Sequence, residues 1–78
     1  MENDKLESLK TAKLCLKRIA KEKDEKYRNA LMYQFCLQMR RFCNLTAKES
    51  KSRDVKHHLK SQASTFGAIA KIYRGLGE

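Results

Sequence analysis

A regular spacing of apolar residues in the last third of the chain constrains the fold more than any other feature of the sequence. These residues recur at steps of four, three, four and three: Leu59, Ala63, Phe66, Ala70 and Tyr73. Because an α-helix turns once every 3.6 residues, all five side chains lie on one stripe of a helix. A small residue at every seventh position of the stripe lets a neighbouring helix approach closely. The pattern therefore predicts one helix of a small helical bundle.

Two upstream segments also show helical patterns. The first predicts a helix over about 4–21, with a buried stripe formed by Leu6, Leu9, Ala12, Leu16 and Ile19. The second, over about 25–44, is apolar round more than half its circumference, which is typical of a central helix that contacts two neighbours. A charged stretch at 22–25 and a polar segment at 44–54 separate the helices. The acids of the first stretch suit the positive amino end of the second helix, and Ser50, Ser52 and Asp54 offer caps for the third.

These segments predict the fold class. The absence of proline and the presence of only three glycines suit a largely helical chain. Connectors of about four and ten residues are the lengths that antiparallel helices need. We expect an all-α, antiparallel three-helix up-down-up bundle: one domain, residues 1–78, with helices at about 4–21, 25–44 and 54–76.

The sequence contains little that points to catalysis. It has no glycine-rich phosphate loop, no nucleophile elbow and no zinc motif of carboxylates and histidines. His57 and His58 are adjacent, so on a helix they point about 100° apart and cannot both face the cysteines. Cys15, Cys36 and Cys43 each fall among apolar residues, which predicts buried, reduced thiols. We expect no enzyme activity, no cofactor and no metal.

The hydropathy of the chain bears on its location. No apolar run approaches the roughly 18 to 20 residues of a membrane span, and the first ten residues lack the apolar core of a signal peptide. The sequence therefore predicts an intracellular, cytoplasmic protein.

The chain is strongly basic, with a formal net charge of +9. Residues 27–78 hold ten Lys or Arg against three Asp or Glu, so the excess positive charge belongs to the second and third helices. A basic cluster surrounds the predicted junction of these helices: Arg40, Arg41, Lys48, Lys51, Arg53, Lys56 and Lys60. Such a cluster suits an acidic peptide, phosphates or an anionic surface, or it simply keeps a small domain soluble. Nucleic acid ranks second among the expected partners. Nucleic-acid-binding surfaces usually interleave aromatic residues with cations, whereas the aromatic residues here fall on core stripes.

The order of residue types in the second and third helices resembles a known family. The segment from Lys26 to Tyr33, Lys-Tyr-Arg-Asn-Ala-Leu-Met-Tyr, is similar to the opening of the second helix in MIT (microtubule interacting and trafficking) domains. The ladder from Leu59 to Tyr73 resembles the third helix of the same family. The excess of basic over acidic residues is more similar to that of MIT domains from microtubule-severing AAA ATPases, such as katanin, than to that of the more acidic members of the family.

The resemblance implies a non-catalytic protein-interaction module. MIT domains bind acidic or amphipathic tail peptides of ESCRT-III-type proteins in grooves between helices, and some contact microtubules. Carried onto this sequence, the expected peptide groove is Met32, Cys36, Met39, Ala63, Ala70 and Leu76. The expected basic rim is Arg40, Arg41, Lys56, Lys60, Lys71 and Arg74.

Two other roles stay open at this point. A small basic nucleic-acid-binding bundle is the alternative function. A structural or oligomerisation segment would use the wide apolar face of the second helix as its seam. We expect the isolated domain to be a monomer that binds an acidic protein tail, either ESCRT-III-type or tubulin.

Overall fold

The computed structural model describes residues 2–77, and within this range the chain forms three α-helices and no strand. Helix α1 spans Glu2–Lys21, α2 spans Glu25–Glu49 and α3 spans Arg53–Gly77. Short connectors at 22–24 and 50–52 join them. The all-helical three-helix fold predicted from periodicity is confirmed.

Capping groups mark the start of the second and third helices. Asp24 precedes α2 with an extended backbone, and its side chain accepts a hydrogen bond of 3.0 Å from the Lys26 amide. Arg28 ties the connector to the helix by donating to the Glu22 carbonyl at 2.8 and 3.2 Å. Ser52 precedes α3, and its hydroxyl accepts from the Val55 amide at 3.4 Å. These oxygens satisfy amides that the first helical turn leaves without a partner.

The second helix is longer than the sequence pattern predicts. It continues through the polar segment to Glu49, five residues beyond the expected end at 44. The buried residues Cys36, Cys43 and Ala47 are spaced by seven and four, so the helical phase of α2 persists into this segment. Burial of Ala47 therefore holds the last turn, and the connector to α3 shrinks to three residues.

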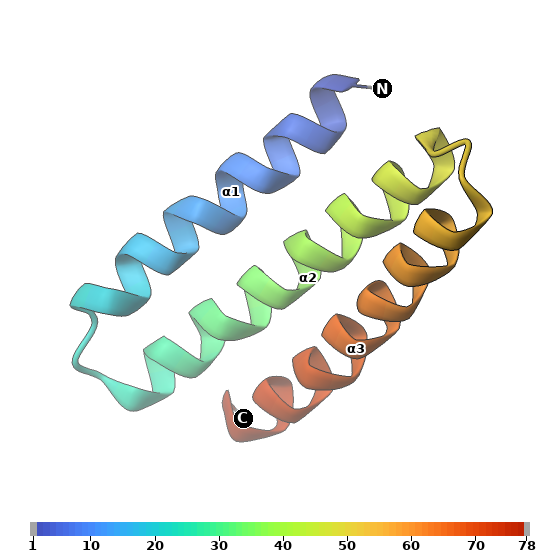
Figure 1. Ribbon diagram of the computed structural model, residues 1–78. Coiled ribbons are helices and arrows are strands. Elements are labelled where there is room, and N and C mark those ends of the chain that lie inside the picture. Colours follow the sequence, from blue (N-terminus) through green and yellow to red (C-terminus); the bar gives the residue numbers. More distant parts are fainter. Residues whose placement is uncertain (1, 78) are drawn as a thin grey trace.

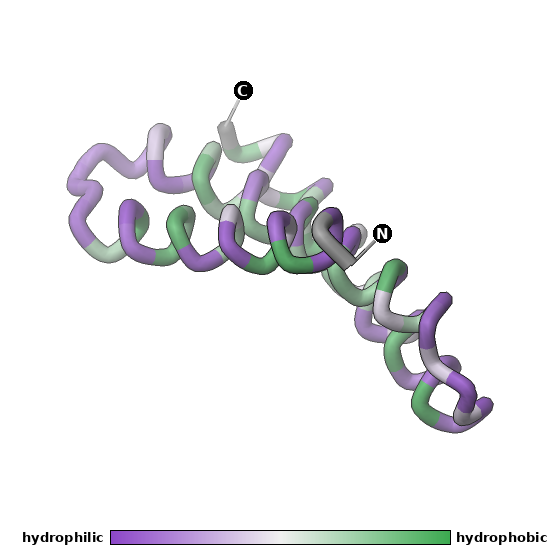
Figure 2. Tube along the Cα trace, turned by 90° about the horizontal axis from the view of Figure 1, so that it is seen from above, coloured by the Kyte–Doolittle hydropathy of each residue, from purple (hydrophilic) through white to green (hydrophobic). Residues whose placement is uncertain are grey.

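The helix α2 is the centre of the arrangement. Figure 1 shows α1 on one side of α2 and α3 on the other. Both outer helices contact α2, whereas within residues 2–77 no Cα atom of α1 lies within 8 Å of a Cα atom of α3. The molecule is elongated, measuring 42 × 23 × 16 Å. In Figure 2 hydrophobic and hydrophilic residues alternate along each helix, as amphipathic packing requires.

Small residues form the most deeply buried part of the core. They are Ala12, Cys15, Cys36, Cys43, Ala47, Ala63 and Ala70, together with Leu31 and the polar Ser8. The ladder of α3 is confirmed, because Ala63 and Ala70 are buried and its three larger members are half-buried. The helix axes thus approach most closely where side chains are small.

The predicted stripe of α1 is confirmed for Ala12, which is buried, and for Leu9 and Ile19, which are half-buried, but it is wrong for the other two leucines. Leu6 and Leu16 were expected in the core, but they are 51% and 47% exposed. The side that packs on α2 is the line Ser8, Ala12 and Cys15, all of which are buried. These short side chains permit close contact, and the larger leucines lie on the flank of that line.

Candidate functional site

The predicted peptide groove between α2 and α3 is filled by the protein itself. Cys36, Ala63 and Ala70 are only 2%, 4% and 1% exposed. Their side chains are part of the helix contact, so no peptide can reach them while the helices stay packed. The expectation that they line an open groove is therefore corrected by their burial.

The other three predicted groove residues do not converge on one site. Met32 and Met39 are half-buried on α2. Leu76 is 60% exposed near the end of α3, where it borders a shallow hollow with Glu25, Lys26 and Asn29 from the start of α2. That hollow is distant along α2 from Met39, and its lining includes a carboxylate.

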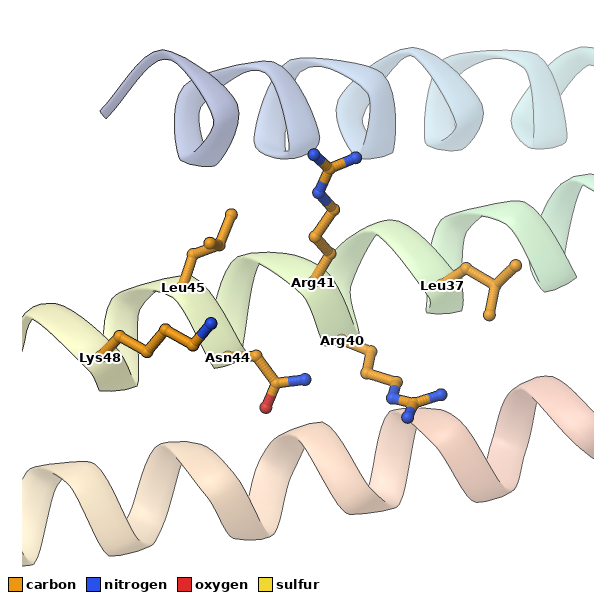
Figure 3. A pocket seen from close by; sticks show the side chains of 6 residues that line it. All are labelled: Leu37, Arg40, Arg41, Asn44, Leu45 and Lys48. Atoms are coloured by element: carbon orange, nitrogen blue, oxygen red, sulfur yellow. The ribbon is translucent and has the colours of Figure 1, made fainter. Parts of the chain in front are cut away.

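Arg40 stands between two hollows on the surface of α2 and α3. The first, of about 340 Å³, is formed entirely by side chains of α2, shown in Figure 3: Leu37, Arg40, Arg41, Asn44, Leu45 and Lys48. The second lies between the helices and is lined by Arg40, Ser64, Gly67, Ala68 and Lys71. We call the residues of these two hollows the basic face.

The Arg40 side chain packs against Gly67 of the neighbouring helix. A Cβ atom on Gly67 would lie 3.5 Å from the Arg40 Cδ and 3.8 Å from its Cζ. The aliphatic stem and guanidinium of Arg40 therefore rest against the backbone of α3. In Figure 3 the Arg40 side chain points toward α3 and that of Arg41 toward α1. The two arginines thus spread positive charge across the width of α2.

The basic face has no compensating negative charge. No carboxylate lines either hollow. Within residues 2–77, none of its four cations, Arg40, Arg41, Lys48 and Lys71, forms an ion pair. The printed sequence offers only Glu49 and Asp54 as acids between residues 26 and 77. An incoming anionic group therefore meets unpaired guanidinium and ammonium groups beside two leucines.

The remaining rim residues occupy different positions. Lys60 is exposed on the α3 line that continues through Ser64, Gly67 and Lys71, so it lies in phase with the second hollow. Lys56 is half-buried one turn earlier. Arg74 is exposed in the last turn of α3 and borders neither hollow.

Several residues of the basic face were not in the predicted site. Leu37, Asn44 and Leu45 supply its apolar and amide groups, and Arg40 packs against Gly67. A signal for the first hollow exists in the sequence, because Leu37, Arg41, Asn44 and Lys48 recur at steps of four, three and four. No sequence pattern pairs Arg40 with Gly67, since that contact joins two different helices.

The cysteines and histidines form no reactive site. All three thiols are free and buried, as predicted. Burial removes Cys36 and Cys43 from water and raises the pKa of both thiols, which keeps them protonated and unreactive. His57 and His58 are exposed on α3. Among the described residues no group of three or more potential ligands is arranged to hold a metal ion.

Comparisons with known proteins leave the family of the chain open. No protein-family model, no curated protein and no solved structure matches the sequence or the fold significantly. Within the described part of the chain, none of the helices has the length and apolar character that crossing a membrane demands.

Proposed function

We propose that this chain is a non-catalytic protein-binding module that takes an acidic, amphipathic helical peptide on its basic face. One observation carries the proposal: Arg40 joins two adjacent hollows that hold four unpaired cations and no carboxylate. Charged groups of opposite sign steer partners together and fix their register. The acids of the peptide would pair with Arg40, Arg41, Lys48 and Lys71.

The apolar residues of the face select the class of partner. Leu37 and Leu45 are half-buried among the cations, so they can receive apolar side chains of a peptide helix. A nucleic-acid surface typically places aromatic rings among its cations for base stacking. Here the first and second hollows contain no aromatic residue. The face therefore favours an amphipathic peptide over a nucleic acid.

We also infer the antiparallel up-down-up order of the helices, on which the face depends. Lys5 near the start of α1 bonds to Glu49 at the end of α2 at 2.7 Å. The Phe35 and Phe66 ring centroids are 6.4 Å apart, which supports opposite directions for α2 and α3 joined by a short connector. The course of the ribbon in Figure 1 is consistent with this order. The reversal at 50–52 sets Arg40 beside Gly67.

The resemblance to MIT domains supports the kind of partner but not the position of the site. It suggests an acidic protein tail, of ESCRT-III type or from tubulin, met in the cytoplasm. Tyr27, which carries part of the resemblance, is 52% exposed and borders a separate hollow with Asp24, Lys26 and Ala30. In our proposal the peptide lies on the basic face instead of in the closed groove.

A binding titration with two charge variants tests the proposal. The probe is a synthetic amphipathic helix with leucines on one face and glutamates beside them, compared with a DNA duplex. Arg40→Glu should weaken peptide binding by about tenfold or more, because an exposed cation of the basic face becomes a repelling anion. The control, Lys17→Glu, makes the same charge change at an exposed position of α1 and should leave affinity nearly unchanged.

Two outcomes decide against the proposal. Equal weakening by both variants would mean that the total charge of the chain matters and the basic face does not. Tighter binding of the duplex than of the peptide would favour the nucleic-acid function. Peptide affinity should also fall with rising salt, since exposed charges separated by about 10 Å are screened at 0.1 M ionic strength.

A further inference from the structure

The side of the molecule opposite the basic face carries an apolar surface that the proposed function does not use. On α2, Phe35, Phe42 and Glu49 recur at steps of seven and so lie on one line of the helix. At one end of this line Phe35 packs edge-on against Phe66 of α3, with ring centroids 6.4 Å apart. At the other end Glu49 pairs with Lys5 of α1 at 2.7 Å. The line therefore faces the space between the two outer helices.

The outer helices do not close over this line. Within residues 2–77 no Cα atoms of α1 and α3 come within 8 Å of each other. Phe35, Met39, Phe42 and Phe66 remain half-buried, although aromatic and Met side chains of a closed bundle would be covered. The aromatic rings at this side of the core are therefore partly exposed to solvent.

The flank of α1 continues the apolar surface. Lys5, Leu9 and Leu16 are spaced by four and seven, so they lie on one line of α1. Because Lys5 on this line pairs with Glu49, the line faces the same side of the molecule as the line of Phe35 and Phe42. Leu16 is 47% exposed and Leu9 is half-buried. We define the open face as Leu9, Leu16, Phe35, Met39, Phe42 and Phe66.

The total surface of the chain shows how much area is uncovered. Its solvent-accessible surface is 6019 Å². A compact monomer with its mass of 9.1 kDa is expected to expose about 4,900 Å². The excess of about 1,100 Å² exceeds the roughly 800 Å² that each partner buries in a stable, specific protein interface. This excess belongs to the elongated chain as a whole, and the partly exposed residues of the open face contribute to it.

We propose that the open face is the interface of a homodimer, in which a second copy of this chain covers the rings of the first. The six residues of the open face are uncharged, and the two charged residues on the same lines, Lys5 and Glu49, pair with each other. Interface cores are likewise enriched in Phe and Met and depleted of charge. A two-fold interface uses the same patch on both subunits, so a self-complementary apolar face suffices. This proposal replaces the expectation of a monomer.

Charge segregation favours a second copy as the occupant. Arg40 and Phe42 are two residues apart and hence about 160° apart round α2. Dimerisation through the open face directs the two basic faces outward and away from each other, which limits repulsion between two chains of charge +9. The basic faces stay accessible to peptide.

Sedimentation equilibrium of residues 1–78 with two leucine variants tests the proposal. Leu16→Glu places a charge in the open face and should weaken dimerisation by about tenfold or more. The control is Leu14→Glu, on the same helix, at a position 57% exposed and about 160° away from Leu16. It should dimerise like the parent. Both leucines are half exposed in the single chain, so circular dichroism should show unchanged helicity in each variant.

Salt and the basic-face variant separate this proposal from the proposed function. High salt screens the repulsion between two basic chains, so dimerisation should stay constant or strengthen, whereas peptide binding should weaken. Arg40→Glu should leave the dimer intact. A monomer at concentrations far above micromolar would overturn the homodimer, as would equal effects of Leu14→Glu and Leu16→Glu. A monomer whose peptide binding is lost in Leu16→Glu would instead identify an acidic helix as the occupant.

Discussion

The Arg40 side chain lies across Gly67, with its Cδ, Nε and Cζ atoms 3.5, 3.7 and 3.8 Å from the position that a Cβ atom of residue 67 would take. This contact fixes one edge of the basic face, because it holds a long cationic side chain against the backbone of α3. It also shows that a methyl group at residue 67 would meet only ordinary van der Waals neighbours. Gly67 is therefore permissive for a small side chain.

Gly67→Ala should stabilise the chain by about 0.5 to 1 kcal/mol, because glycine in a helix interior costs that much relative to alanine. Urea unfolding followed by circular dichroism measures the change. The matched control is Gly75→Ala, where a Cβ atom would meet nothing within 4 Å but the helix is near its end. It should give a smaller gain. A loss of stability confined to Gly67→Ala would mean that Arg40 cannot shift to accept the methyl group.

The Phe35–Phe66 pair should contribute measurably to the association of α2 with α3. Phe66→Ala is expected to cost about 2 to 3 kcal/mol, less than the 3 to 5 kcal/mol of a fully buried ring, because Phe66 is half-buried. A double-mutant cycle with Phe35→Ala should yield a coupling energy of about 0.5 to 1.5 kcal/mol for the edge-on geometry. A coupling of zero would show that the two rings do not interact in solution.

Asp24→Ala should lower the free energy of unfolding by about 1 kcal/mol, since it removes the side-chain acceptor of the Lys26 amide. Asp24→Asn keeps an acceptor oxygen and should cost only a few tenths of that amount. Thermal or urea unfolding of both variants measures the difference. If the two variants lose equal stability, the negative charge near the positive end of α2 is the stabilising feature and the cap is not.

The thiols of Cys36 and Cys43 should make stability decrease at alkaline pH. Their pKa values are raised by burial, so the folded state holds the thiol protons more tightly than the unfolded state does. This contribution is complete below the ordinary thiol pKa of about 8.5 and is lost as the pH rises from there through the raised native values. Unfolding measured from neutral to alkaline pH should show a shallower decline in a Cys36→Ala/Cys43→Ala variant.

Thiol reactivity gives an independent check on the same burial. A water-soluble disulfide reagent should react with Cys36 and Cys43 far more slowly in the folded chain than in urea, because their thiolates form rarely and lie inside the protein. Rapid reaction of both thiols under native conditions would contradict the packing of α2 against α3.

The sequence predicts the helices and much of the contact between α2 and α3. The spacing of Leu59, Ala63, Phe66, Ala70 and Tyr73 locates the buried side of α3, because periodicity and burial reflect the same 3.6-residue turn. Asp24 correctly marks the start of α2, since an Asp before an apolar helical run satisfies free amides in almost any tertiary context. Local chemistry suffices for both predictions.

Only some residues of the predicted site lie on the basic face. Arg40, Arg41 and Lys71 do line the hollows of the basic face. Cys36, Ala63 and Ala70 were assigned to a groove but form the helix contact, because small residues at seven-residue spacing draw helices together and leave no space between them. A sequence pattern identifies an apolar stripe without revealing whether another helix already covers it.

The sequence by itself determined the number of helices, their approximate limits, the burial of the cysteines and the basic character of α2 and α3. Only the tertiary structure decided which flank of α1 packs, that α1 and α3 stay apart, and that Arg40 meets Gly67. The physical reason is that helix formation depends on neighbours within a few residues of the chain. The choice of face depends on how the side chains of separate helices fit together, and short residues such as Ser8 and Ala12 permit a closer fit than Leu6 and Leu16 do.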